Sequence, residues 1–582
     1  MSTATLASLL PVAVIAPIGG AILAPLVARL DPRAPLLISM VAMACSLAVL
    51  LVIAPRVYGG VDISHYMGNV VPFGGHVLGI AFAADPLGMT FAIAAAAIGG
   101  LLLLFTLSSL RELAPRELGG YACLFQLLLA ALIGSALTAD LFNLFVWFEV
   151  AALASYGLTG FFLERPIALE AAFKLLVLTT LASFFIFIGA ALLYADHGAL
   201  NFAQLHGALA HGATTTDLVA LTLLLCGFAT KAGLVPFHAW LPDAHTAAPG
   251  PVSALFSALM VNLGLIAIAR IALQIYGPAL ASPLLTLLLV AGLVSALGGA
   301  LLALAQDDLK RLLAFDTISQ MGVLVIGIAA GNAAGLAGTT YHLLSHALFK
   351  ALLFLCAGAI VHMTGETDLS RMGGLARRQP VLAVAFTVGV AGIAGVPLLS
   401  GYPSLALIHS GVRDTDTAAY AVELVAQVIT IAALARAAYL AFYRRRDKAY
   451  ERFDRIHPGM TVALWLLGAA AVALGVFPSW VLDHIAAPAA ASLLDTSGYS
   501  HAVLSGAVRI PSLHIALSYF DPQELITVAI SIVLGLALAA AYLRISEPAP
   551  ITLLRRVHNG SVNDYAAFAV IGVLCTLAVL AT

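Results

Sequence analysis

Charged residues are scarce in this sequence. Of its 582 residues only 10% are Asp, Glu, Lys or Arg, whereas 62% are hydrophobic. Soluble globular proteins carry about 25% charged residues, so the composition excludes a large water-soluble domain. The formal net charge of −2 provides no basic surplus for binding nucleic acid.

Paired cysteines and cofactor motifs are also missing. The five cysteines stand singly inside apolar runs, without the spacing of a disulfide or a metal site. The sequence has no CxxC motif, no dinucleotide-binding glycine motif after a strand and no recognisable pair of haem ligands. We therefore expect no cofactor, no resident metal and no redox or hydrolytic centre in this chain.

Long apolar runs are the dominant feature that is present. A transmembrane helix needs about 20 apolar residues, and runs such as 83–107 lack the alternation of a transmembrane β-strand. The sequence predicts an all-α polytopic membrane protein with about 16 transmembrane helices. The expected spans are 5–29, 34–54, 83–107, 119–138, 139–163, 168–194, 217–238, 248–277, 281–305, 311–330, 334–362, 380–402, 418–443, 459–483, 521–545 and 562–582.

The basic residues are distributed unequally between the two sides of these spans. Loops after odd-numbered spans carry 19 Lys and Arg residues, whereas loops after even-numbered spans carry 3. Cytoplasmic loops are enriched in Lys and Arg, so we predict that both termini lie outside. The apolar N-terminus has no preceding basic residue, which favours a retained first helix over a secretory signal.

The spans fall into four regions. Region 1–118 holds helices 1–3 and an outer loop, 119–277 and 281–443 each hold five helices, and 459–582 holds helices 14–16. The stretches 55–82 and 484–520 do not span and are expected to pack over the outer helix ends or to contact a partner.

Each of the two middle regions contains a helix interrupted by glycine or proline. Broken helices at corresponding places of two halves mark the transport site of inverted-repeat transporters. We therefore predict two inverted five-helix repeats, helices 4–8 and helices 9–13. The interrupting residues are Pro236 and Pro242 in the first repeat, and Gly392, Gly395, Pro397, Gly401 and Pro403 in the second.

Several ionisable residues lie within the expected spans, and the four that call for an explanation are Glu149, Lys174, Lys231 and Lys350. A charge at the bilayer centre costs roughly 2.5–3.5 kcal/mol even on the lenient insertion scale, so each is a functional candidate. The alternatives are a lysine that reaches the interface or a pair that only locks helices. These alternatives stay open, and they are strongest for Lys174, which lies closer to a helix end.

Two histidines precede Lys350 at intervals of four residues. A step of four rotates about 40° around a helix, so His342, His346 and Lys350 share one face. Neutral imidazole accepts a hydrogen bond on one nitrogen and donates from the other. This pattern favours a proton wire over a satisfied core histidine.

A second polar group occurs after the seventh span, with His238, Asp243 and His245. These residue types can bind a metal ion. They lie at a polar helix end, however, and we expect solvation there rather than a metal site.

Several long motifs resemble one family of membrane proteins. They are "LTADLFNLFVWFEVAALASYGLTG", "TKAGLVPFHAWLPDAHTAAPGPVSALFSALM", "LAQDDLKRLLAFDTISQMG" and "YHLLSHALFKALLFLCAGAI". Over residues 85–410 the sequence is similar to the antiporter-like subunits shared by respiratory complex I, membrane-bound hydrogenases and Mrp-type Na+/H+ antiporters. "DLFNLFVWFE" and "GALNFAQL" resemble the D-type subunits of the Mrp antiporters most, whereas the tail "LRRVHNGSVNDYAAFAVIG" resembles the larger members.

The resemblance implies roles for individual residues. Glu149 and Lys231 match the glutamate on the fifth helix and the lysine on the broken seventh helix of the family's proton relay. His342, His346 and Lys350 match its central connection. Where many relatives carry a histidine this chain has Ser257, and where they carry Lys or Glu after the second broken helix it has Leu405, for which His409 is a candidate substitute.

The resemblance implies a proton-translocating subunit of a multisubunit monovalent cation/proton antiporter. The alternative is a proton-pumping membrane-arm subunit of a complex I-like or hydrogenase-type redox complex, so whether the assembly is an enzyme stays open. A purely structural scaffold is disfavoured by the series of lysines within spans. The expected partners are other membrane subunits, H+, the lipid bilayer and, as a second candidate ion, Na+, in the cytoplasmic membrane of a prokaryote.

The expected ion for this chain is H+ rather than Na+. Sodium prefers a cage of oxygen ligands, and apart from Glu149 the acidic residues Asp308 and Asp316 are placed near the cytoplasmic end of their helix. The sequence therefore predicts few oxygen ligands within the membrane.

Overall fold

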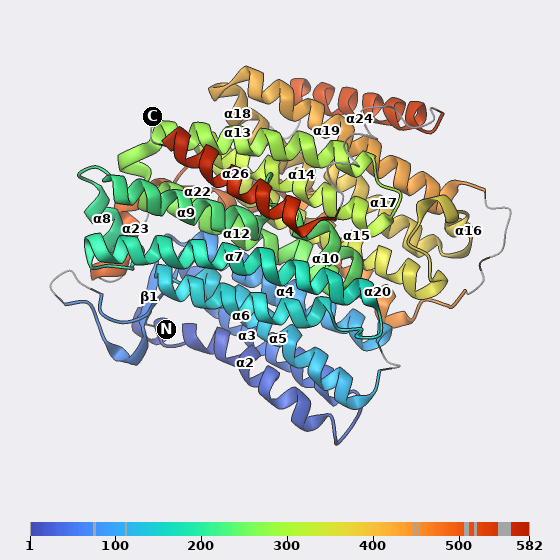
Figure 1. The fold of residues 1–582 in the computed structure, drawn as a ribbon, viewed down its shortest axis with the longest axis horizontal. Coiled ribbons are helices and arrows are strands. Elements are labelled where there is room, and N and C mark those ends of the chain that lie inside the picture. The colour runs from blue at the N-terminus through green and yellow to red at the C-terminus, as the bar shows by residue number, and fades with distance from the viewer. Residues whose placement is uncertain are drawn as a thin grey trace.

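The computed structural model describes residues 2–73, 77–110, 113–445, 450, 453–505, 511–516, 521–544 and 560–580. Its main feature is a bundle of long helices that lie side by side, with a two-stranded sheet at one end (Figure 1). Seven of the basic loop residues counted above lie outside the described residues, namely Arg111, Arg446, Lys448, Arg452, Arg509, Arg555 and Arg556.

The first half of the chain folds into helices α1 (Thr3–Ala7), α2 (Leu10–Val27), α3 (Ala34–Tyr58), α4 (Pro86–Ser109), α5 (Pro115–Leu137), α6 (Leu141–Thr159), α7 (Pro166–His197), α8 (Phe202–Leu209), α9 (Thr215–Ala232), α10 (Trp240–Ala247), α11 (Gly250–Leu255) and α12 (Val261–Ala269). The second half contains α13 (Gly277–Leu304), α14 (Leu309–Ala329), α15 (Ala333–Thr364), α16 (Leu375–Arg378), α17 (Pro380–Ile393), α18 (Gly401–Thr415), α19 (Thr417–Ala438), α20 (Pro458–Val476), α21 (Pro478–Val481), α22 (Ala487–Leu494), α23 (Thr496–Ser505), α24 (Pro522–Tyr542) and α26 (Val562–Leu580).

Single turns of 3-10 or π-helix add η1 (Met67–Asn69), η2 (Phe256–Met260), η3 (Arg270–Ile275), η4 (Leu369–Arg371), η5 (Tyr439–Tyr443) and η6 (Leu482–Ala486). Strands β1 (Ile63–Tyr66) and β2 (Ala81–Ala84) pair antiparallel, with Ile63 opposite Ala84.

Prolines and capping side chains determine where many helices begin. Proline is the first residue of α4, α5, α7 and α24, a position where its missing N–H costs no hydrogen bond. Asp140 and Asp308 precede α6 and α14, and their carboxylates accept backbone N–H groups of the first turn. These signals place α6 and α14, which carry candidate site residues.

Fifteen helices within the described residues are long and apolar enough to cross a membrane. This confirms the predicted all-α, multi-pass architecture, with one span fewer than the sixteen expected. The difference arises at the expected span 380–402, which is divided into α17 and α18 by a non-helical segment. The two inverted repeats and the four-region division stay predictions.

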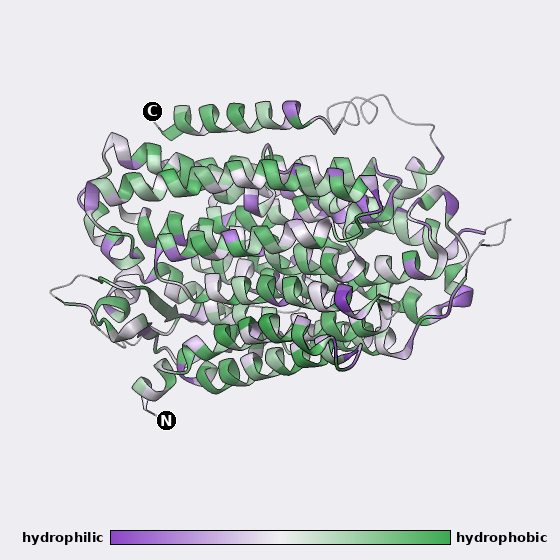
Figure 2. Ribbon diagram, turned by 60° about the horizontal axis from the view of Figure 1, so that its bottom comes forward, coloured by the Kyte–Doolittle hydropathy of each residue, from purple (hydrophilic) through white to green (hydrophobic). Residues whose placement is uncertain are grey.

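The centre of the bundle is formed by α14 and by the continuous segment from α11 to η3. Both are buried along their whole length, and α15 beside them is nearly so. By contrast, α24 and α26 expose most of their surface. Hydrophobic residues make up most of the length of the helices, whereas hydrophilic residues gather mainly toward the helix ends and loops (Figure 2).

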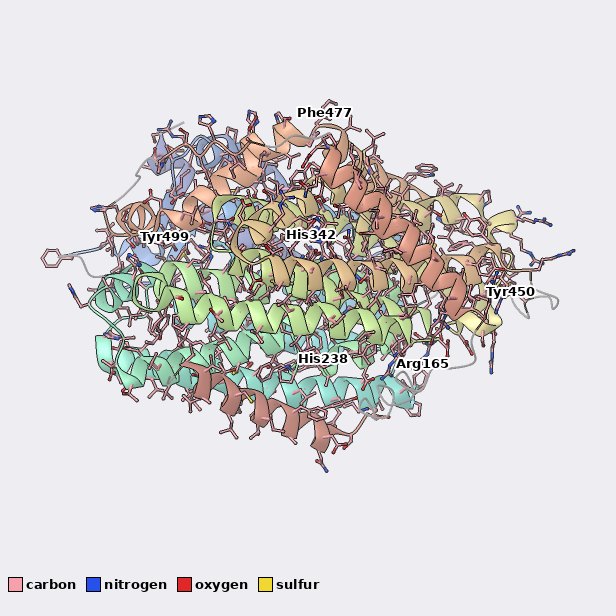
Figure 3. The ribbon with its side chains drawn as sticks, turned by 90° about the horizontal axis from the view of Figure 1, so that it is seen from above. Arg165, His238, His342, Tyr450, Phe477 and Tyr499 are labelled. Atoms are coloured by element: carbon pink, nitrogen blue, oxygen red, sulfur yellow. The ribbon has the colours of Figure 1, made fainter. Side chains whose placement is uncertain are left out.

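The two ends of the bundle carry different loops. Arg165 and Tyr450 lie at one end, Tyr499 lies at the opposite end, and His342 lies between them (Figure 3). The N- and C-terminal ends of the chain lie at the same end of the bundle (Figure 1). This arrangement agrees with an even number of crossings.

The two stretches expected outside the membrane contain short elements. The first holds β1, η1 and β2, and the second holds α22 and α23. Helix α23 packs against α8 and β1, and the Ser64 hydroxyl donates a hydrogen bond of 3.2 Å to the Ala502 carbonyl. As expected, the described parts of these stretches pack over helix ends.

Candidate functional site

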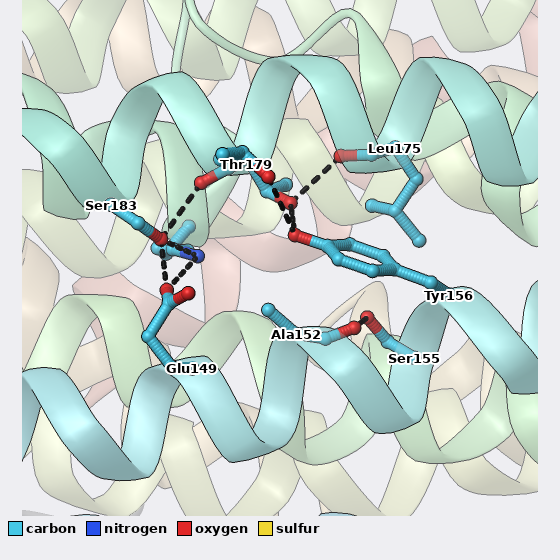
Figure 4. A network of polar contacts seen from close by, with 9 residues as sticks. Glu149, Ala152, Ser155, Tyr156, Leu175, Thr179 and Ser183 are labelled. Atoms are coloured by element: carbon cyan, nitrogen blue, oxygen red, sulfur yellow. Dashed lines mark hydrogen bonds and ion pairs between the residues drawn. The ribbon is translucent and has the colours of Figure 1, made fainter.

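Glu149 and Lys231 are brought together by α6, α7 and α9. The Lys231 amine lies 3.9 Å from the Glu149 carboxylate, and it donates a hydrogen bond of 2.9 Å to the Ser183 hydroxyl. Ser183 in turn donates to Glu149 through a short contact. The hydroxyl therefore bridges the lysine and the carboxylate, as Figure 4 shows around Ser183 and Glu149.

Lys231 lies in the last turn of α9, where the helix that the sequence predicted to be broken comes to an end. The helix ends at Ala232 because Gly233 takes a left-handed conformation, with φ of 72°. The C-terminus of a helix carries a partial negative charge that favours a cation. The break therefore places the Lys231 amine at a helix C-terminus, in a residue that is 4% exposed.

Glu149 is less buried than the sequence predicted. Its side chain is 33% exposed in the isolated chain, whereas that of Lys231 is 5% exposed. Its exposed neighbours on α6 are apolar, with Val146 and Leu153 on the same surface. A carboxylate is thus presented on an otherwise apolar face of the bundle.

Further polar groups continue from Ser183 along α7. The Tyr156 hydroxyl lies 2.6 Å from the Thr179 hydroxyl, which donates to the Leu175 carbonyl (Figure 4). A cavity of about 10 Å³ between Thr179, Ser155 and Lys231 has room for a single water. Hydroxyl groups and space for a water therefore surround the lysine.

Lys174 belongs to a different group of charges. Its amine lies 2.6 Å from Glu170 and 3.1 Å from Asp243, whose other oxygen lies 3.2 Å from Arg311. The structure therefore places Lys174 in an ion-pair network between α7, α10 and α14, apart from Glu149 and Lys231.

Lys350 lies near the middle of α15, as predicted, and is fully buried. Its amine forms a short ion pair with Asp316 of α14 and donates a hydrogen bond of 3.1 Å to the Leu313 carbonyl. Sequence reasoning placed Asp316 near the cytoplasmic end of its helix. It is the eighth residue of α14, two turns from the start of the helix, and its side chain is completely buried against the lysine.

The two histidines of α15 differ in their surroundings. His342 is held on both sides, with Nδ1 2.9 Å from the Ser404 hydroxyl and Nε2 2.9 Å from the Gln320 amide oxygen. Neither ring nitrogen of His346 has a hydrogen-bond partner among the described residues, although the ring is 1% exposed. The ring centroids of the two histidines are 6.5 Å apart.

Ser257 contacts α14 next to the pair formed by Lys350 and Asp316. Its hydroxyl is 2.7 Å from the hydroxyl of Thr317, the residue after Asp316. Ser257 is part of η2, between α11 and α12, and α12 packs against α9. A hydroxyl pair thus lies beside Asp316 in sequence, on a segment that continues into the helix packed against α9.

His409 of α18 is buried between two carboxylates. Its Nδ1 lies 2.7 Å from Glu524 of α24, and its Nε2 lies 2.9 Å from Glu423 of α19. Sequence reasoning considered His409 but neither glutamate. Leu405, one turn earlier on α18, is also buried.

The structure corrects the expectation for His238, Asp243 and His245. His238 and His245 are 5% and 0% exposed, so they are buried rather than solvated. His245 stacks on Phe354, with ring centroids 4.8 Å apart, and Asp243 is paired with Lys174 and Arg311. Within the described ranges, no group of three or more His, Cys, Asp or Glu side chains is placed to hold a metal ion.

The prediction of few oxygen ligands within the membrane left Glu423 and Glu524 out of account. Asp316, Glu423 and Glu524 all lie in candidate membrane spans and are buried. Glu423 stands inside an apolar run, which is the signal by which Glu149 was found, whereas Asp316 and Glu524 lie closer to the polar starts of their helices. Ser183 gave no such signal, because a serine in an apolar helix usually bonds only to its own backbone.

The site contains groups that accept and release protons. Amines, carboxylates and imidazoles alternate with hydroxyls and an amide from α6 to α18. Such a series can pass protons when its members change protonation or orientation.

Comparison with known proteins identifies the relatives of this chain. Residues 138–430 match the family described as "NADH:quinone oxidoreductase/Mrp antiporter, TM". The chain is 32% identical to the N-type subunit of NADH-quinone oxidoreductase from Desulforudis audaxviator, over 70% of this chain and 84% of that protein. It is 30% identical to the D-type subunit of the Na(+)/H(+) antiporter from Bacillus subtilis, over 73% and 86%.

A solved structure shares this fold over most of the chain. The structure of the Mrp complex from Dietzia sp. DQ12-45-1b contains a chain with a TM-score of 0.78 and 27% identity. The match covers 87% of this chain and 100% of that one.

Proposed function

Because this chain belongs to the transmembrane family of NADH:quinone oxidoreductases and Mrp antiporters, we propose that it is the proton-translocating subunit of a multisubunit monovalent cation/proton antiporter. The similarity to the D-type Na(+)/H(+) antiporter subunit and to a chain of an Mrp complex favours the Mrp type. H+ is the ion assigned to this chain, and a Na+ path belongs mainly to a partner subunit.

One observation carries the proposal. Lys231 and Lys350 are both buried inside the bundle, and each has a carboxylate beside it from a neighbouring helix. Placing two such pairs in a membrane is costly. The cost is accounted for if the lysines and carboxylates exchange protons during transport.

The proposed relay runs from Glu149 through Lys231 to Lys350 and then through His346 and His342. Lys231 lies 3.9 Å from Glu149 with Ser183 between them, so a small separation of the two weakens their attraction. A buried amine without its counter-charge favours the neutral form. Lys231 then releases its proton toward the central pair, with Ser257 and Thr317 beside the route.

The exposed carboxylate of Glu149 supports a partner subunit at this face. A charge on an apolar surface within the membrane needs cover from protein or water, and here the described surroundings on α6 are apolar. We place the complex in the cytoplasmic membrane of a prokaryote, with both termini of this chain outside. In this assembly a neighbouring membrane subunit covers Glu149.

The test is ion exchange by the intact complex. The complex is purified, its subunits are identified by mass spectrometry, and it is reconstituted into liposomes that contain a pH-sensitive dye. A pulse of Na+ should drive proton movement in the opposite direction, and an assembled complex with Lys231→Ala should not respond. An intact complex that moves no protons with either Na+ or K+ would overturn the proposal.

The alternative is a membrane-arm subunit of a redox-driven proton pump. It is favoured by the similarity to the N-type subunit of NADH-quinone oxidoreductase over 84% of that protein. The same relay would serve, but the driving reaction would take place in other chains. Iron–sulfur proteins among the co-purified subunits, together with proton movement on addition of a reductant and a quinone, would support this alternative.

A further inference from the structure

His409, Glu423 and Glu524 form a second buried ionisable cluster, away from Glu149 and Lys231. The three side chains come from α18, α19 and α24, and the residues are 1%, 1% and 5% exposed. Nδ1 of His409 forms a hydrogen bond of 2.7 Å with Glu524. Nε2 lies 2.9 Å from Glu423 without hydrogen-bond geometry, so neither Nε2 nor the Glu423 oxygens have a hydrogen-bond partner among the described residues. The ring of Tyr420 closes a further side of His409, with centroids 5.4 Å apart.

The charges of this cluster do not balance. A protonated imidazole offsets one carboxylate, so a second carboxylate leaves one negative charge in excess. Within the described part of the chain, no Lys or Arg forms an ion pair with either glutamate. Arg436, which is also on α19, pairs instead with Asp307.

An excess buried charge has a simple consequence. An ion pair that only holds α18 to a neighbouring helix (a structural lock) needs His409 and one carboxylate. A second carboxylate would only add a desolvation cost. Uptake of one more proton makes the cluster neutral. The arrangement therefore has the composition of a site that binds and releases a proton.

Two further polar residues, Ser404 and Gln427, lie on the helices α18 and α19 that carry His409 and Glu423. Ser404, which bonds to His342, lies on the same helix as His409, five residues earlier, or about 7.5 Å along the axis. Gln427 lies one turn after Glu423 on α19. Its amide is 6% exposed, and neither of its side-chain polar atoms has a partner among the described residues.

Gln427 also lies beside the break in the second half. A Cβ built on Gly395, which has φ of 73°, would lie 3.6 Å from the Gln427 amide nitrogen. The break thus brings an unpartnered amide and the end of a helix close to the cluster. Unwound backbone at membrane depth must face protein or water.

The cluster lies near the ends of its helices. His409 is six residues before the end of α18, Glu423 is the seventh residue of α19, and Glu524 is in the first turn of α24. A depth of about two turns corresponds to roughly 10 Å. A proton at Glu524 therefore has a short route to the helix ends.

We propose that His409, Glu423 and Glu524 form a proton-exchange site at the end of the relay. Glu423 takes up a proton while His409 is an imidazolium, and His409 then gives its Nδ1 proton to Glu524, which passes it to water at the helix ends. Rotation of the neutral ring turns the nitrogen that lost its proton toward Glu423, from which it accepts the stored proton and becomes an imidazolium again. One proton enters and one leaves, and the reverse sequence carries protons inward. This inference rests on the proposed function of the complex.

The test uses Glu423→Gln, Glu524→Gln and His409→Gln in the intact complex, reconstituted in liposomes. Each variant should lower cation-driven proton movement by roughly 10²-fold, the loss typical of a removed proton-transfer group. The two Glu→Gln variants should leave the melting temperature of the complex unchanged or raise it, because they remove the excess buried charge. Loss of transport with retained stability distinguishes an exchange site from a structural lock.

His197→Gln is the matched control. His197 lies 2.7 Å from Asp217, so it forms a histidine–carboxylate pair of similar chemistry at the junction of α7 and α9. This variant should transport at the wild-type rate. Infrared difference spectra recorded on a pH change should also contain a carboxylic C=O band that is lost in Glu423→Gln or Glu524→Gln.

Three outcomes would contradict the inference. Wild-type rates in all three cluster variants would show that protons bypass the cluster, whereas a wild-type complex without exchange would refute the proposed function itself. Lower stability in both Glu→Gln variants, with transport per folded complex retained, would indicate a lock. A raised KM for Na+ with an unchanged maximal rate and pH profile would indicate a cation site instead.

Discussion

Lys231 and Lys350 differ in how their charges are held. Lys231 has a hydroxyl at 2.9 Å and a carboxylate at 3.9 Å, whereas Lys350 contacts its carboxylate directly in a fully buried pair. Coulomb attraction grows as distance and dielectric constant fall. We therefore expect Lys231 to release its proton more readily and Lys350 to hold its proton until Asp316 or a neighbour changes state.

The first prediction concerns Lys231. Lys231→Ala and Lys231→Arg should both nearly abolish transport, since guanidinium stays protonated and cannot hand on a proton. The measurement is the collapse of a proton gradient on cation addition in inverted vesicles, normalised to assembled complex. Lys174→Ala is the control and should be milder, because Lys174 belongs to a separate ion-pair network. Near-wild-type transport by Lys231→Arg would refute the relay role.

The second prediction concerns the pair of Lys350 and Asp316. Asp316→Asn leaves the lysine buried without its counter-charge, which typically costs about 3–5 kcal/mol. We expect a lower melting temperature and nearly complete loss of transport. The double variant Asp316→Leu/Lys350→Met should recover the melting temperature but not the transport. Recovery of both would assign the pair a purely structural role.

At the scale of elements, two helices are broken in the same way, by a left-handed glycine followed by a proline. After α9 the chain passes through Gly233 at φ of 72°, and after α17 through Gly395 at φ of 73°, each followed within three residues by a proline. Left-handed glycine ends a helix at little cost, and proline prevents its continuation. The breaks place Lys231 at a helix end in the first half and Gln427 beside an unwound segment in the second.

The third prediction concerns the first break. Gly233→Ala forces a residue with a Cβ into the left-handed region, at a cost of roughly 1–2 kcal/mol, and its Cβ would lie 2.5 Å from the Leu241 side chain. We expect lower stability together with a lower transport rate, because Lys231 is two residues away. Gly198→Ala is the control, since Gly198 ends α7 at φ of 64° with no atom within 4 Å. Equal transport in the two variants would argue against a role for the break.

At the scale of the whole molecule, the basic loops and the positions of the chain ends agree. Arg165 lies at one end of the bundle, and the two ends of the chain lie at the other (Figures 1 and 3). Since basic loops stay in the cytoplasm, the end that holds Arg165 is expected to face inward.

The fourth prediction tests this orientation. A reporter active only in the cytoplasm should be active when fused after Arg378 and inactive when fused after Leu580, because an odd number of crossings separates the two sites. A reporter active only outside should show the opposite pattern. Activity of the same reporter at both sites would contradict the even number of crossings.

The fifth prediction concerns assembly. The chain expressed alone should insert but show negligible cation/proton exchange, because Glu149 lies one-third exposed on an apolar face and the Na+ path is assigned to a partner. Liposome flux assays on the purified chain and on the complex measure the difference. Robust exchange by the single chain would show that both the cation path and the proton path lie within it.

Much of this architecture follows from local properties of the sequence. Hydropathy and the distribution of Lys and Arg were sufficient to predict a multi-pass helical protein, since each depends only on a helix and its flanking loops. The cost of a charge in the membrane also singled out Glu149, Lys231 and Lys350, because that cost depends on the apolar run around each residue.

The pairing of these charges was decided only by the tertiary structure. Asp316 lies 34 residues from Lys350, and Glu524 lies 115 residues from His409, and no local pattern indicates that they meet. Which side chains share a buried space depends on how α14, α15, α18, α19 and α24 pack, and thus on shape rather than hydropathy. The sequence by itself therefore determined that charges lie within the membrane, whereas the packing of the helices determined that Lys350 is neutralised by Asp316 and that His409 lies between two glutamates.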